Sequence, residues 1–115
     1  MNYICKCYKE NFFNKNYSYW EDRAVTSDEL DAINFISNFK TLRFQSILHI
    51  GIGNSFLCKK IHNNRNITGI TISKKEIDKA NSLNIPNYKI YLCDKYSIEF
   101  NSLIKKKKFD LIIDT

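Results

Sequence analysis

The spacing of the apolar residues along this chain changes several times, and each change indicates where a new helix or strand is expected. Leu30, Ile33 and Ile36 recur at the spacing of one helix face, and Phe39 extends the stripe by one turn. The segment TSDE at 26–29 precedes them and has the composition of a capping box, in which side chains satisfy the free amides of the first helical turn. The pattern predicts a core-facing helix at this place.

Short extended segments and helical segments alternate in the rest of the chain. Expected strands cover 46–52, 66–72, 87–93 and 109–114, and expected helices cover 54–63, 73–85 and 97–107. A second capping box, Ser73 to Glu76, begins the middle helix, and Pro86 stops it. Strict alternation of strand and helix is typical of a parallel sheet with right-handed crossovers.

The chain is expected to form one domain with an N-terminal arm. Residues 1–25 are rich in aromatic side chains without a clean period, so we interpret them as an irregular arm and residues 26–115 as the domain. The 43% hydrophobic and 26% charged content is that of a globular protein, and no apolar run reaches the ~18 residues that span a bilayer. The N-terminus has no signal-peptide pattern, which favours the cytoplasm.

Charge and cysteine content favour neither a nucleic-acid partner nor a metal site. The net charge is +6, but the basic residues are scattered, and the dense run at 105–108 closes an expected helix, where cations complement the dipole. Cys5 and Cys7 are too close for the usual zinc spacing, and the other cysteines, Cys58 and Cys93, are far apart in the sequence. We therefore expect free thiols and no metal.

Two of the three glycines lie in one turn, ILHIGIGNSFL, where an expected strand passes directly into a helix. Glycine allows a sharp turn and leaves no Cβ between the backbone and a ligand, while the first amides of the following helix face that ligand. Gly51 and Gly53 could therefore form a nucleotide-binding turn. They could equally be needed only for a tight connection between strand and helix.

The segment 46–115 resembles the first half of class I S-adenosylmethionine-dependent methyltransferases. The run from Ile47 to Ser55 is similar to the first motif of that family, and GITIS at 69–73 is similar to the branch of the cyclopropane fatty acid synthases. The resemblance implies a Rossmann-like α/β fold with strand order 3-2-1-4 and helices on both faces, truncated relative to the seven strands of the family. It also implies S-adenosylmethionine as cofactor and methyl transfer as activity.

The resemblance also implies which residues contact the cofactor. These are His49, Gly51, Gly53, Asn54, Thr71, Ile72, Asp94 and Asp114. Asp94 holds the place of a carboxylate that accepts from the adenine amino group. The family usually has an acid where this chain has His49, a glycine where it has Ser55, and a ribose-binding acid at Thr71, whose hydroxyl makes a weaker contact than a carboxylate.

Alternatives stay open at this point. The sequence assigns no catalytic residue and no methyl acceptor, and a non-catalytic binding or oligomerisation module derived from a methyltransferase is the second hypothesis. A dinucleotide oxidoreductase is weaker, because the turn lacks the full G-x-G-x-x-G spacing. The apolar strand expected at 109–114 is an outer strand in this topology, so we expect self-association or a partner chain along it.

Overall fold

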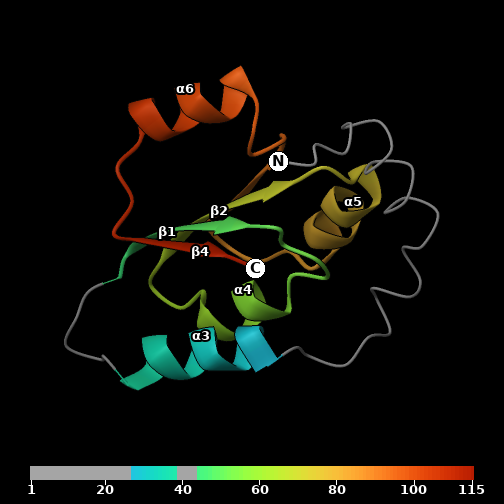
Figure 1. The fold of residues 1–115 in the computed structure, drawn as a ribbon. Helices are drawn as coiled ribbons and strands as arrows, with labels where there is room; N and C mark the ends of the chain where they lie inside the picture. The colour runs from blue at the N-terminus through green and yellow to red at the C-terminus, as the bar shows by residue number, and fades with distance from the viewer. Residues whose placement is uncertain (1–26, 39–43) are drawn as a thin grey trace.

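A computed structural model describes residues 27–38 and 44–115 of the chain (Figure 1). The elements in chain order are α3 (Ser27–Asn38), β1 (Ser46–Ile50), α4 (Phe56–Ile61), β2 (Asn66–Thr71), α5 (Lys74–Ser82), β3 (Tyr88–Leu92), α6 (Ile98–Lys106) and β4 (Leu111–Asp114). The expected alternation is confirmed, and each strand begins and ends within two residues of its expected bounds. The expected arm at 1–25, the first residue of the first capping box and Phe39 lie outside the described residues.

The four strands form one parallel sheet in the order β3-β2-β1-β4, which confirms the predicted topology. Ile47 of the central strand β1 lies opposite Ile67 of β2 and Leu111 of β4. Because all strands run the same way, their carboxyl ends meet at one edge of the sheet, where open α/β sheets bind their ligands. Within the described residues β3 and β4 are the outer strands, and the expected self-association along β4 stays a prediction.

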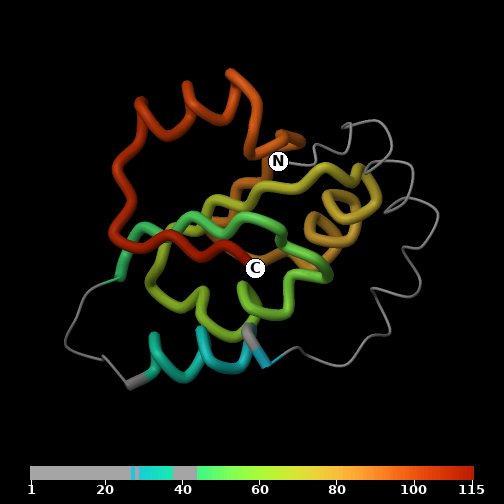
Figure 2. The backbone as a smooth tube through the Cα atoms, viewed as in Figure 1, coloured from blue at the N-terminus to red at the C-terminus, as the bar shows by residue number. Residues whose placement is uncertain are grey.

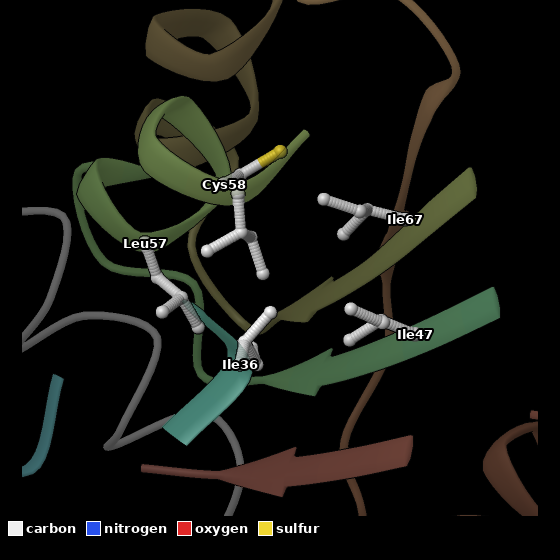
Figure 3. Close-up of a cluster of buried hydrophobic side chains, with 6 residues drawn as sticks. Ile36, Ile47, Leu57, Cys58 and Ile67 are labelled. Atoms are coloured by element: carbon white, nitrogen blue, oxygen red, sulfur yellow. The ribbon is translucent and has the colours of Figure 1, made fainter. Parts of the chain in front are cut away.

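Helices cover both faces of the sheet, as expected (Figures 1 and 2). The side chains of α3 and α4 pack on one face in a cluster drawn in Figure 3, which contains Ile36, Ile47, Leu57, Cys58, Ile61 and Ile67. On the other face Phe100 of α6 packs with Leu48, Ile70 and Cys93. The two clusters separate the odd and even positions of β1, which is the alternation that a strand buried on both faces requires.

Polar side chains fix where the helices begin and end. Ser73 and Ser97 accept hydrogen bonds from amides of the first turns of α5 and α6, as N-cap residues do. Asn64, Asn84 and Asn87 have φ of 59°, 53° and 57°, a left-handed conformation that asparagine tolerates better than most residues. These asparagines reverse the chain between helix and strand, so the boundaries follow from local chemistry.

One expected core position is exposed. The sequence pattern puts Leu30 of α3 on the buried stripe, but its side chain is 47% exposed, while Ile36 on the same helix is 1% exposed. The reason is length, since α3 has 12 residues and the helix it packs on, α4, has only 6. At 1.5 Å per residue the shorter helix covers only about half of the longer one. None of the described helices has the length and hydropathy needed to cross a membrane.

Gly69 in β2 is needed for close packing rather than for backbone freedom. A Cβ at this position would lie 2.7 Å from Cγ2 of Ile52 and 3.0 Å from the Tyr88 ring. We expect Gly69→Ala to lower the free energy of unfolding by about 1–3 kcal/mol, the usual penalty for overpacking a core. Urea denaturation measures this, with Lys74→Ala on the exposed side of α5 as the control. An unchanged or higher urea midpoint for Gly69→Ala would contradict this expectation. It would mean that the Ile52 and Tyr88 side chains can move away without loss of stability.

Candidate functional site

The carboxyl edge of the sheet collects the predicted site residues. Gly51 and Gly53 follow β1, and Thr71 is the last residue of β2. Asp94 lies two residues beyond β3, and Asp114 ends β4. Positions far apart in the sequence are thereby brought to one edge, as the parallel topology requires.

The two glycines of the turn have different roles. Both have positive φ, 82° at Gly51 and 55° at Gly53. A Cβ at Gly51 would lie 3.0 Å from the carbonyl oxygen of Thr115, so this glycine accommodates the chain beyond β4. A Cβ at Gly53 would have nothing within 4 Å among the described residues. Gly53 is therefore the position where a ligand can approach the backbone.

The residues after the glycines complete the turn with local hydrogen bonds. The side-chain oxygen of Asn54 accepts from the Phe56 N–H at 3.1 Å, so this predicted contact residue caps the start of α4. Ser55 has φ 65° and is fully buried, and its hydroxyl lies 2.9 Å from the hydroxyl of Tyr88. The place where the family has a third glycine thus still has the backbone conformation that favours glycine.

Two substitutions at Ser55 separate backbone strain from the hydrogen bond. Ser55→Ala leaves the hydroxyl of the half-buried Tyr88 without this partner, and we expect a loss of about 1–3 kcal/mol of unfolding free energy. Ser55→Gly loses the same bond but relieves the left-handed strain, so it should be about 1 kcal/mol more stable than Ser55→Ala. Chemical denaturation of the two variants tests this, and an alanine variant as stable as the glycine variant would contradict it.

A buried carboxylate that the sequence pattern does not reveal lies at this turn. Glu76 of α5 is 5% exposed, and its Oε1 accepts a hydrogen bond from the Thr71 hydroxyl at 2.6 Å. The backbone N–H of Gly53 donates a second bond to the same carboxylate. Thr71 also accepts from the Ser73 N–H at 3.0 Å, which fixes the direction of its hydroxyl proton. The carboxylate therefore bridges the glycine turn and the end of β2.

The sequence predicts Glu76 only as the last residue of a capping box. One half of that box is present, because the Glu76 N–H donates to the Ser73 hydroxyl, while the Ser73 N–H donates to the Thr71 hydroxyl. Burial raises the pKa of the Glu76 carboxyl, and the hydrogen bonds from Thr71 and Gly53 partly oppose this. The sequence contains one signal that could have drawn attention to Glu76. Position 71 lacks the acid of the family, and Glu76 is the first acid after it. The threonine at the end of β2 therefore holds a carboxylate that comes from α5.

Asp94 lies beyond β3 and organises the connection to α6. It is 5% exposed, its Oδ1 accepts from the Tyr96 N–H at 2.9 Å, and its carbonyl accepts from the Ser97 hydroxyl at 2.6 Å. A carboxylate has about four lone-pair sites, and the hydrogen bonds made by the described residues occupy one of them. Asp94 therefore caps a turn and keeps acceptor capacity for a ligand.

The last two predicted positions are more open. The Asp114 side chain is 49% exposed and forms an ion pair of 3.1 Å with Lys95, which follows Asp94. This pair joins the loop after β3 to the end of β4. Ile72 is half-buried directly after Thr71 and offers an apolar surface at the end of β2.

His49 is a buried, neutral histidine next to the glycine turn. It is 2% exposed, and its Nε2 lies 3.0 Å from the hydroxyl of Thr115. Burial lowers the pKa of the imidazole to about 4, and the nearby Asp114 carboxylate opposes this only in part. Its Nδ1 is buried without a hydrogen-bond partner among the described residues. The place where the family has an acid therefore has an uncharged side chain.

Comparison with solved structures identifies this architecture. The magnesium protoporphyrin IX methyltransferase of Synechocystis PCC 6803, solved with S-adenosylhomocysteine, has a TM-score of 0.71 at 16% identity, over 95% of this chain and 57% of that one. The chain has the fold of class I methyltransferases. The plantazolicin methyltransferase BpumL, solved with a triazolic desmethylPZN analogue and S-adenosylhomocysteine, has a TM-score of 0.63 at 22% identity, over 91% of this chain and 42% of that one.

A third methyltransferase structure supports the same fold. The amino pentose methyltransferase of Micromonospora echinaspora, solved with bound S-adenosylmethionine, gives a TM-score of 0.57 at 14% identity, over 100% of this chain and 44% of that one. The chain thus spans between 42% and 57% of the lengths of these three class I methyltransferase chains. No protein-family model matches the chain, and no curated protein does either.

Proposed function

We propose that this chain binds S-adenosylmethionine at the carboxyl edge of its sheet and serves methyl transfer to an acceptor. The observation that carries the proposal is the bridge at Glu76, where a buried carboxylate meets the open glycine of a strand-to-helix turn. A nucleoside ligand needs both features, an acceptor for ribose hydroxyls and a backbone that it can approach closely. The methyltransferase fold supports this assignment.

The strand order matches the order of the groups along the cofactor. Asp94 follows β3 and would accept from the adenine amino group, with the half-buried Ile72 beside the ring. Glu76, held by Thr71 at the end of β2, would accept from the ribose hydroxyls. The turn after β1, with Gly53, would hold the amino-acid part. Two steps between neighbouring strands span about 10 Å, so the three strand ends can contact successive groups of one extended ligand.

The chain's own residues would contribute binding and orientation. The bound cofactor supplies a methyl group that is already activated on a sulfonium, so placement against the acceptor accounts for most of the rate. Glu76 and Asp94 would fix the nucleoside at two strand ends, and the turn after β1 would then fix the direction of the sulfonium. The ion pair between Lys95 and Asp114 would lie beside the nucleoside.

Thr71 has a different role from the one its position implied. An acid there would repeat the family arrangement, but its carboxylate would take the place of a hydroxyl that donates to Glu76 at 2.6 Å. Two carboxylates at that distance repel each other, which raises the pKa of one of them. Thr71 is therefore a positioning residue for Glu76 in this proposal.

Calorimetric titration tests the proposed function. We expect saturable binding of S-adenosylmethionine and S-adenosylhomocysteine and none of NAD, because the turn lacks the glycine spacing for a pyrophosphate. Gly53→Val places a side chain in the open space and should lose most of that binding. Binding of NAD alone, or of no ligand, would refute the proposal. Equal affinity in Gly53→Val would remove the turn from the site.

We also propose that the protein works in the cytoplasm. Both cysteines among the described residues, Cys58 and Cys93, are free and buried. Burial raises the pKa of the Cys58 thiol to about 12, so it stays protonated and unreactive. Free thiols fit a reducing compartment.

A further inference from the structure

The fold brings five lysines to the side of the sheet that α6 covers (Figure 1). Four of them form the run 105–108, which begins in the last turn of α6. The fifth, Lys89, lies on the outer strand β3 opposite Thr68, and Thr68 lies opposite Leu48 of β1. Leu48 packs against α6, so Lys89 belongs to the same face of the sheet. The helix end and the outer strand therefore place lysines on one side of the molecule.

Tyr91 joins these two groups of lysines. It follows Lys89 by two residues on β3, and side chains at this spacing in a strand point to the same face. The Lys107 ammonium donates a hydrogen bond to the Tyr91 hydroxyl at 3.4 Å, and its Nζ lies 5.5 Å from the centre of the ring. Tyr91 is nevertheless 38% exposed. We call Lys89, Tyr91 and residues 105–108 the basic surface.

Nearby acids do not balance the charge of the basic surface. The segments that carry it, 87–92 and 100–109, contain no Asp and no Glu. None of its five lysines forms an ion pair with a described residue, and all of them except the half-buried Lys107 are exposed. The net charge of the whole chain is +6, so the rest of the chain is close to neutral. The dipole of α6 explains cations in its last turn but not Lys89 on another element. The basic surface is therefore suited to an anionic partner.

The kinds of side chain in the basic surface favour a phosphate chain as this partner. A helix that binds a bilayer surface inserts apolar side chains, but the apolar side of α6 packs on the sheet through Phe100. Protein interfaces are enriched in arginine and depleted of lysine, and the basic surface has lysines and no arginine. Lysines make point contacts to phosphates, and an exposed tyrosine ring can stack on an unpaired base.

We infer that the basic surface binds single-stranded nucleic acid, with its lysines on the phosphates and Tyr91 stacked on a base. Phosphate and stacking contacts carry little sequence information, so this binding tolerates any base sequence. The sequence pattern favours no nucleic-acid partner, because it does not show that Lys89 and Tyr91 lie beside the run 105–108. The inference is independent of the proposed function, since this run leads into the start of β4, at the edge of the sheet opposite the cofactor site.

Fluorescence anisotropy with a labelled oligothymidylate of about 12 nucleotides tests the inference. At ~50 mM salt we expect saturable binding, and the logarithm of the association constant should fall with the logarithm of the salt concentration with a slope of about −3, as four or five phosphate contacts require. Replacing Lys105, Lys106 and Lys108 together by alanine should reduce the slope to about −1 and weaken binding at least about tenfold.

Two further comparisons separate a specific surface from general charge. A triple control, in which the exposed Lys59, Lys74 and Lys75 become alanine, removes the same charge and should change the affinity less than about threefold. Tyr91→Leu removes the ring and should weaken binding about ten- to a hundredfold without changing the salt slope. Tyr91→Phe keeps the ring and should bind as the wild type does.

The salt slope and a comparison with a duplex of the same length use the wild-type protein, so they do not depend on how the variants fold. No binding at ~50 mM salt, or equal losses in the two triple variants, would overturn the inference. A duplex bound as tightly as the single strand, or an unchanged affinity in Tyr91→Leu, would contradict the stacked base. Binding of phosphatidylserine vesicles or of polyglutamate without binding of the oligonucleotide would also overturn the inference.

Discussion

Acidification from pH 6.5 to pH 4 is expected to remove about 3 kcal/mol of unfolding free energy through His49 alone. Burial lowers the pKa of this imidazole from 6.5 to about 4. His49 therefore becomes protonated below pH 6.5 in the unfolded chain but only near pH 4 in the folded chain. A tenfold difference in proton affinity between the two states corresponds to about 1.4 kcal/mol. The contribution is fully present above pH 6.5 and is lost as the pH falls through this window.

The comparison with His49→Gln isolates this effect, because glutamine does not titrate. Chemical denaturation at several pH values should show that the wild type loses about 3 kcal/mol more unfolding free energy than His49→Gln between pH 7 and pH 4. Glu76 acts in the opposite direction, since burial raises its pKa and makes the folded state more favourable at acid pH, but it is present in both proteins. Parallel curves would contradict the buried neutral state of His49.

Replacing Glu76 by alanine should reduce the affinity for S-adenosylhomocysteine about a hundredfold. The variant removes a carboxylate that would accept from the ribose hydroxyls, and hydrogen bonds to charged groups are the stronger ones. Glu76→Gln keeps an oxygen that can accept from the Gly53 N–H and should stay within about tenfold of the wild type. Calorimetric titration measures both constants.

A change of ligand locates this loss at the ribose. The 2′-deoxy analogue of S-adenosylhomocysteine already lacks one hydroxyl, so the ratio of wild-type to Glu76→Ala affinity should be smaller for it than for the parent ligand. Thermal unfolding of the variant without ligand shows whether it is folded. The same ratio for both ligands would mean that Glu76 acts through the turn and not on the ribose.

The order and bounds of the elements could be predicted because they follow from local chemistry. Ser73 and Ser97 begin their helices, and asparagines such as Asn64 end the segments before the next strand. The strand order and the common edge for Thr71 and Asp94 came from the family resemblance, and the sheet confirms them.

The contacts that define the site could not be predicted in the same way, because they join residues distant in the sequence. Neither the helical spacing of the apolar residues nor the capping box indicates that the Glu76 carboxylate accepts hydrogen bonds from Gly53 and Thr71. Likewise, the sequence pattern favours Gly51 as space for a ligand, but the space is filled by Thr115, 64 residues later. The sequence assigns these residues to the correct elements, but tertiary packing determines what each side chain contacts.

The most direct test of the proposed site is an NMR titration of the ¹⁵N-labelled chain with S-adenosylhomocysteine. The largest shifts are expected at the backbone amides of Gly53, Thr71 and Asp94, which lie at three neighbouring strand ends. Amides in the last turn of α6, such as Lys105, should not shift. This turn leads into the start of β4, at the edge of the sheet opposite the proposed site. Shifts confined to α3 or α6, or none at ~1 mM ligand, would contradict a nucleoside site at the carboxyl edge of this sheet.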